Sequence, residues 1–108
     1  MTVPFNSNWF PHWSRSPKPL TLIAFPHAGA GAGVFGGLRR AAPEWLDIQP
    51  VQLLGREDRL SETMPDTLDA LLERIVPAMT PVFERPFALM GYSMGARIAC
   101  ALAHRLES

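Results

Sequence analysis

Three short apolar runs, each followed by a segment with helical features, constrain the fold of this chain more than any other feature. The runs cover residues 20–25, 48–54 and 87–90. Continuous apolar runs of this length are typical of strands that are buried on both faces of a sheet. Strands that alternate with helices form a parallel sheet with right-handed crossovers. The sequence therefore predicts an α/β fold in which a three-stranded parallel sheet is flanked by helices.

The sequence signals for the helices differ in strength. The pattern predicts a short helix over residues 34–42 and an alanine-rich helix over residues 94–106. The strongest signal lies between them, where apolar residues recur with the i, i+3, i+4, i+7 spacing of an amphipathic helix. We expect Asp66 to cap its N-terminus, and Pro77 and Pro81 to kink or split its second half. The apolar residues are Leu68, Leu71, Leu72, Ile75, Val76, Met79, Val82 and Phe83.

Proline is concentrated at the N-terminus, in residues 1–19. Proline at this density disfavours helices and central strands, so this segment is predicted to be an extended arm. The arm also carries tryptophans, which need to be covered, and we expect it to lie along the domain formed by residues 20–108. The residues concerned are Pro4, Pro11, Pro17 and Pro19, together with Trp9 and Trp13.

Charge and cysteine content exclude several classes of protein. The chain has 108 residues, and its 10 Lys and Arg balance its 10 Asp and Glu, so the formal net charge is zero. A neutral chain with scattered arginines favours neither nucleic acid nor an anionic membrane as a partner. The single cysteine, Cys100, excludes an internal disulfide and a cysteine-based zinc site, and we expect it to be buried on its helix. With no leader and no membrane-spanning run in the sequence, we expect the protein to act in the cytoplasm.

A G-x-S-x-G motif, Gly91-Tyr92-Ser93-Met94-Gly95, follows the third apolar run. It fits the nucleophile elbow of α/β-hydrolases, in which a serine sits on a sharp strand-to-helix turn with its hydroxyl exposed. Gly91 and Gly95 are needed because neighbouring backbone comes too close for a Cβ. Ser93 is therefore the candidate nucleophile, the Met94 amide a candidate oxyanion donor, and Tyr92 a residue that lines the site. A tight turn with a capping serine is the structural alternative.

A loop of small residues, His27-Ala28-Gly29-Ala30-Gly31-Ala32-Gly33, follows the first apolar run. Proteins with the elbow take a second oxyanion amide from the loop after an earlier strand, and Ala28 is the candidate. His27 is expected to line the site. The glycine spacing does not match the G-x-G-x-x-G of dinucleotide-binding loops. A flexible connection without function is the alternative for this loop.

Three motifs in order along the chain resemble type II thioesterases, which are stand-alone α/β-hydrolases that serve polyketide and nonribosomal peptide synthases. They are residues 9–35, the turn 55–59 with the sequence Gly-Arg-Glu-Asp-Arg, and the elbow 91–96. The resemblance implies an α/β-hydrolase sheet with the strand order 2-1-3. The uniformly apolar first run suits a central strand, and Pro50 suits an edge strand because it has no amide to donate.

The resemblance also implies an activity. A type II thioesterase is a serine enzyme that hydrolyses acyl or peptidyl thioesters from the phosphopantetheine of carrier proteins, in an editing role. Its partners are acyl or peptidyl carrier protein domains, and it needs no metal or organic cofactor. By the same order along the chain, His27 precedes the serine and is not the base. Arg56 and Arg59 could contact the phosphate of the substrate, although a charged turn is more often only solvated.

The acid and the base of the catalytic triad follow the serine in this fold, in the order Ser, Asp, His. Residues 94–108 contain one histidine, His104, and one carboxylate, Glu107, and the resemblance implies that the family's Asp and His lie beyond them. We therefore expect the chain to be the N-terminal part of an α/β-hydrolase and to be inactive by itself. Two other functions stay open, namely an esterase or lipase of the same fold, or a catalytically dead fragment that binds carrier protein.

Overall fold

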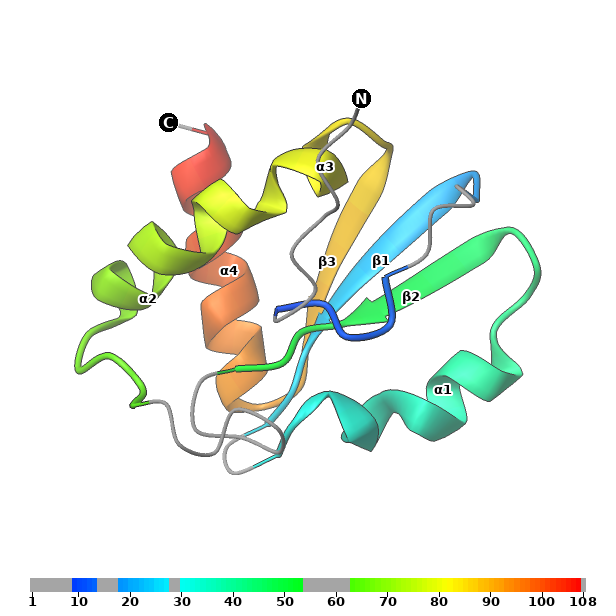
Figure 1. Cartoon of the computed structure of the whole chain (residues 1–108), viewed down its shortest axis with the longest axis horizontal. Helices are drawn as coiled ribbons and strands as arrows, with labels where there is room; N and C mark the ends of the chain where they lie inside the picture. The colour runs from blue at the N-terminus through cyan, green and yellow to red at the C-terminus, as the bar shows by residue number, and fades with distance from the viewer. Residues whose placement is uncertain (1–8, 14–17, 28–29, 54–62, 108) are drawn as a thin grey trace.

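The chain forms layers of helices around one parallel sheet (Figure 1). The computed structural model describes residues 9–13, 18–27, 30–53 and 63–107. The strands are β1 (Leu20–Phe25), β2 (Leu46–Pro50) and β3 (Phe87–Gly91). They lie in the order β2-β1-β3, and both pairings are parallel. The fold class and the strand order predicted from the sequence are confirmed.

The second strand differs from its apolar run, which predicted a strand over residues 48–54. β2 starts two residues earlier and ends at Pro50, a position that suits proline because the ring nitrogen cannot donate to the ladder. Two residues further on, the Gln52 amide donates to the Trp9 carbonyl of the N-terminal segment at 2.8 Å. The backbone has therefore left the sheet at that point, although its side chains remain buried.

The predicted helices are present, and the longest helical pattern is divided as its prolines require. Residues 68–83 form α2 (Leu68–Ile75), the 3₁₀ helix η3 (Val76–Met79) and α3 (Thr80–Phe83). Pro77 and Pro81 lie in the first turns of the second and third segments, where a missing amide breaks no helical bond. The other helices are the 3₁₀ helix η1 (Ala32–Phe35), α1 (Gly36–Ala41) and α4 (Met94–Glu107).

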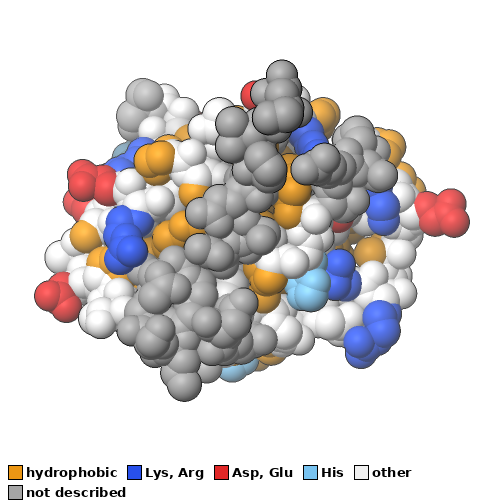
Figure 2. Space-filling model, viewed as in Figure 1, with side chains coloured by type: hydrophobic (Ala, Val, Ile, Leu, Met, Phe, Trp, Pro, Cys, Tyr) orange, Lys and Arg blue, Asp and Glu red, His pale blue; other side chains and the backbone are white. Residues whose placement is uncertain are grey.

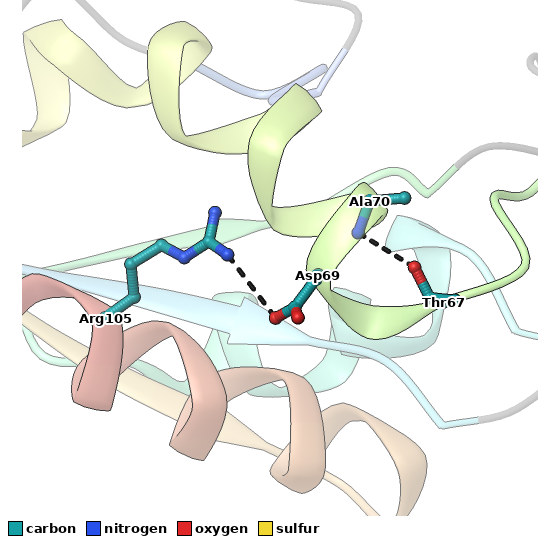
Figure 3. Close-up of polar contacts among 4 residues, drawn as sticks. All are labelled: Thr67, Asp69, Ala70 and Arg105. Carbon is teal, nitrogen blue, oxygen red and sulfur yellow. Dashed lines mark hydrogen bonds and ion pairs between the residues drawn. The ribbon is translucent and has the colours of Figure 1, made fainter.

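The N-terminal cap of α2 is Thr67, so the prediction of Asp66 is wrong by one residue. Thr67 has extended backbone angles, and its Oγ1 accepts a hydrogen bond from the Ala70 amide at 3.1 Å (Figure 3). Threonine and aspartate are both good caps, so the sequence presents two adjacent candidates. Figure 3 also shows Arg105 of α4 reaching Asp69 of α2 at 3.4 Å. The Asp69 side chain is 87% exposed, so this ion pair contributes little stability.

Thr67→Ala is expected to lower the free energy of unfolding by about 1 kcal/mol, because the Ala70 amide loses the acceptor that the cap provides. Asp66→Ala, at the neighbouring exposed position, is the matched control and should change it by less than about 0.5 kcal/mol. Urea unfolding followed by circular dichroism measures both effects. A larger loss for Asp66→Ala than for Thr67→Ala would contradict the assignment of the cap.

Helices cover both faces of the sheet, with α2, α3 and α4 on one face and α1 on the other (Figure 1). The larger apolar cluster lies on the α2 and α4 side and includes Ile23 and Phe25 of β1. The smaller cluster, on the α1 side, consists of Ala24, Phe35 and Ile48. Because alternate residues of a strand point to opposite faces, the central strand needs apolar residues at successive positions. The other buried members of the larger cluster are Trp9, Phe10, Val51, Leu53, Leu71, Leu72, Ile75, Met79, Val82, Ile98, Ala99 and Leu102.

The described part of the N-terminal segment packs onto the larger cluster. Trp9 and Phe10 are buried within it, and the guanidinium carbon of Arg85 lies 4.3 Å from the centroid of the Trp13 ring. Residues 9–13 therefore lie along the domain, as their aromatic side chains require. The division of the chain at residue 19 stays a prediction.

Cys100 is exposed, so the expectation that it is buried is wrong. It lies on the outer side of α4, whose buried residues are Gly95, Ile98, Ala99 and Leu102. The alanine-rich composition of this helix gives a weak apolar pattern. The pattern therefore does not decide whether a small residue next to the buried stripe faces the core or the solvent.

Charged side chains of both signs are spread around the face seen in Figure 2, with basic side chains gathered at the right of the view, where α1 lies. Two of the basic residues, Arg39 and Arg40, belong to the last turn of α1. None of the helices in the described ranges is both long and apolar enough to cross a membrane.

Candidate active site

Ser93 occupies a sharp turn between the third strand and the last helix. β3 ends at Gly91 and α4 begins at Met94, so two residues connect them. Ser93 has a φ of 56°, in the left-handed region that is unfavourable for a residue with a Cβ. Within the described ranges no other non-glycine residue has a positive φ. Ser93 is also exposed, so the turn has the strained backbone and the open hydroxyl that its motif predicts.

Glycines on both sides of the turn let it close against its neighbours. A Cβ on Gly91 would lie 2.2 Å from the carbonyl carbon of Gly95, and a Cβ on Gly95 would lie 2.2 Å from the carbonyl oxygen of Phe25. Both obstacles are backbone atoms, which cannot rotate away as a side chain can. Only glycine fits these two positions without a displacement of α4 from the sheet.

Backbone hydrogen bonds hold the turn against the end of β1. The Tyr92 amide donates to the Phe25 carbonyl at 3.1 Å, and the Gly95 amide donates to the Tyr92 carbonyl at 2.9 Å. Met94 is the first residue of α4, and the first amides of a helix have no acceptor within it and lie at the positive end of its dipole. A negative oxygen beside Ser93 would be stabilised by this helix end.

The loop that follows β1 begins beside the turn. The His27 and Tyr92 rings meet edge to face, with centroids 5.3 Å apart and planes at 64°. The His27 carbonyl accepts a hydrogen bond from the Ala30 amide at 3.1 Å. Ala28, the predicted second oxyanion donor, lies outside the described residues. The structure therefore brings His27 together with Tyr92, and the role of Ala28 stays a prediction.

An apolar hollow of about 380 Å³ opens next to the turn, beside η1, α1 and the end of β3. Three of the predicted site residues, Gly91, His27 and Tyr92, line it, whereas Ser93, Met94 and Gly95 do not. Tyr92 is 63% exposed, so apolar surface faces solvent here. The sequence did not single out the other lining residues, which are Val34, Phe35, Leu38 and Met90.

The spacing of Val34 and Leu38 was the available signal for this hollow, because residues four apart share a face of a helix. Which element that face meets is a tertiary property, and no local pattern predicts it. The charged turn with Arg56 and Arg59 lies outside the described residues.

Among the residues that the structure describes, no three His, Cys, Asp or Glu side chains are grouped so that they could hold a metal ion.

A serine with left-handed backbone, between two glycines and at the junction of a parallel strand with a helix, defines the nucleophile elbow of an α/β-hydrolase. A family model described as a thioesterase domain matches residues 20–108 of the chain. The chain belongs to this thioesterase family.

Two curated relatives illustrate the similarity. The chain is 38% identical over 100 residues to the AMB antimetabolite synthetase AmbE of Pseudomonas aeruginosa, a match that covers 93% of the chain and 5% of that protein. It is 33% identical over 102 residues to the gramicidin S biosynthesis protein GrsT of Aneurinibacillus migulanus, which covers 94% of the chain and 40% of the relative.

Solved structures of type II thioesterases have the same fold. The chain superposes on BorB, the type II thioesterase of the borrelidin biosynthetic cluster, with a TM-score of 0.81 and 31% identity over 98% of the chain and 43% of BorB. The match to RedJ, a thioesterase of the prodiginine pathway in Streptomyces coelicolor, has a TM-score of 0.77 and 34% identity over 94% of the chain and 41% of RedJ. The chain thus spans about two fifths of the length of these proteins, and the resemblance to type II thioesterases is confirmed.

Proposed function

We propose that this chain supplies the nucleophile and the oxyanion donors of a serine thioesterase in polyketide or nonribosomal peptide biosynthesis. The enzyme would hydrolyse acyl or peptidyl thioesters from the phosphopantetheine of carrier protein domains in the cytoplasm, in an editing role. The left-handed backbone of Ser93 carries the proposal, because a strained and exposed serine at a strand–helix junction has a cost that catalysis explains. Family membership and the biosynthetic relatives support the thioester as the substrate.

In the proposed reaction, the Ser93 hydroxyl attacks the thioester carbonyl and loses its proton to a histidine that an aspartate orients. Collapse of the tetrahedral intermediate expels the pantetheine thiol and leaves an acyl-serine, which water then hydrolyses. In α/β-hydrolases the acid and the histidine follow the serine along the chain. The 108 residues would therefore contribute the serine side of the reaction and the binding of the carbonyl oxygen.

The Met94 amide and the Ala28 amide are proposed to hold the oxyanion. The position of Met94 at the first turn of α4 supports its role. The loop position of Ala28, directly after His27, supports the second donor. Each donor in a comparable site contributes on the order of 3 kcal/mol to transition-state binding. His27, Tyr92, Gly91 and Gly95 would shape the site around the acyl group.

A chimaera tests the proposed activity. Residues 1–108 are joined to the part of BorB that follows its matching segment, so that BorB supplies the histidine and the acid. The expected result is thiol release from an acyl carrier protein thioester, abolished by Ser93→Ala, with a weaker rate on the oxygen ester of the same acyl group. Circular dichroism of both proteins shows whether the substitution leaves the fold intact.

The same measurement separates the alternatives. A preference for the oxygen ester would favour an esterase or a lipase and contradict the thioesterase proposal. Retention of carrier protein by a folded chimaera without any Ser93-dependent turnover would favour a binding module.

A further inference from the structure

We propose that Gln52 is a positioning residue for the loop that follows β1, the loop that carries His27 and the proposed oxyanion donor. The structural part of this proposal rests on a buried hydrogen bond between two described residues, Gln52 and Ala32. The catalytic consequence rests on the proposed function.

Gln52 takes the place of a local cap at the end of this loop. The residue is 2% exposed, and its Oε1 accepts a hydrogen bond of 2.7 Å from the Ala32 amide. Ala32 is the first residue of η1, and Gly31 before it provides no side-chain cap. A glutamine twenty residues further along the chain therefore supplies the acceptor that a capping residue usually provides.

The loop is held at its two ends. At the first end, the Phe25 carbonyl accepts a hydrogen bond from the Tyr92 amide, which holds β1 against the elbow. At the second end, Ala32 is bound to Gln52. Four of the six residues from 26 to 31 are alanine or glycine, and such residues have little side chain to pack and, for glycine, wide backbone freedom. The second anchor therefore fixes the point at which the chain leaves this loop and enters η1.

Gln52 is itself fixed by the N-terminal segment. Its amide donates to the Trp9 carbonyl at 2.8 Å, and Trp9 is buried in the larger core cluster. The path of contacts thus runs from Trp9 through Gln52 to Ala32. This arrangement suits a site in which an amide must be held within roughly 0.5 Å of its working position.

Gln49 provides a matched control. It is also a buried glutamine, 0% exposed, and lies three residues before Gln52. Its Nε2 donates to Asp47 Oδ1 at 2.9 Å and to the His12 carbonyl at 3.2 Å, and neither partner belongs to the loop. Replacement of either glutamine by methionine keeps the length of the side chain and removes its polar atoms.

The experiment measures amide hydrogen exchange in the full 108-residue chain by NMR. The rate at Ala32 is expressed relative to that at Ile23, a buried residue of the central strand whose exchange reports global unfolding, so that a rise in the ratio marks local opening at Ala32. In Gln52→Met this ratio should rise at least about tenfold because the amide has lost its acceptor. Gln52→Glu retains an acceptor and should keep the ratio near that of the unmodified chain, as should Gln49→Met. An unchanged ratio in Gln52→Met, or an equal rise in Gln49→Met, would overturn the proposal.

The BorB chimaera shows whether the anchor matters for catalysis. Gln52→Met should lower kcat by between about tenfold and a hundredfold with KM nearly unchanged, because a misplaced oxyanion donor weakens transition-state binding more than substrate binding. Gln49→Met should leave both constants near their original values. Equal kcat values for the two variants would overturn the catalytic part. Failure of the proposed function is distinguishable, because then the chimaera with Gln52 intact would already lack Ser93-dependent turnover while the exchange ratio still responds to Gln52→Met.

Discussion

Gly95→Ala is expected to destabilise the chain by at least about 3 kcal/mol, a large share of the roughly 5–15 kcal/mol that stabilises a typical domain. The new Cβ would lie 2.2 Å from the Phe25 carbonyl oxygen and 2.6 Å from the Pro26 carbonyl oxygen. These atoms belong to the backbone at the end of the central strand, so no rotamer change relieves the contact. The helix must instead move away from β1, which opens the packing of Ile98 and Leu102 in the larger cluster.

Gly37→Ala is the matched control for this substitution. Gly37 lies in α1, and a Cβ there would be 3.8 Å from the Arg40 side chain, which is ordinary contact. Alanine is the better helix former, so the change should be neutral or should stabilise by up to about 1 kcal/mol. The urea midpoint from circular dichroism reports both variants. Equal midpoints for Gly95→Ala and the original chain would refute the close approach of α4 to β1.

The order and type of the elements were predictable because they depend on local patterns. The run at residues 20–25 is apolar at successive positions since β1 is central and covered on both faces. The prolines at 77 and 81 divide a helical pattern by a steric rule that holds in any fold. The end of β2 was not predictable from its pattern, because Gln52 and Leu53 stay buried after the backbone has left the sheet at the hydrogen bond from Gln52 to Trp9.

The candidate site likewise has one part that the sequence predicts and another part that it does not. Ser93 and its two glycines were found from the sequence because the steric constraint acts within five residues. The hollow beside Tyr92 and the hydrogen bond from Ala32 to Gln52 join residues that are far apart in the chain. Gln52 and Gln49 both lie within the same apolar stretch of sequence, yet Gln52 accepts from Ala32 whereas Gln49 donates to Asp47 and His12. The hollow depends on how η1 and α1 lie beside the end of β3, and the hydrogen bond depends on how the segment after β2 lies beside η1. Single-sequence patterns do not contain these arrangements.

The 108-residue chain by itself is expected to release no thiol from an acyl-pantetheine above the rate of its Ser93→Ala variant. A serine hydroxyl is a poor nucleophile without a base within about 3 Å. His104 is the one histidine after Ser93, and α4 runs as a continuous helix from Met94 to Glu107. At 1.5 Å per residue, His104 lies roughly 16 Å from Ser93 along the axis, beyond the reach of any side chain. Loss of the base from such a triad lowers the rate on the order of a millionfold.

His27 is the remaining candidate, because its ring contacts Tyr92 next to Ser93. It belongs to the loop from which the proposed oxyanion donor comes, and in the proposed geometry that loop would lie on the side of the carbonyl away from the base. The His27→Ala variant tests this argument in the same thiol-release assay, with the BorB chimaera as the positive control. A rate in the 108-residue chain that exceeds background and disappears in both Ser93→Ala and His27→Ala would refute the prediction and assign the base to His27. The expected result is a background rate in the 108-residue chain and in both variants, beside an active chimaera. That result would indicate that these residues supply the serine and that the base comes from another part of the enzyme.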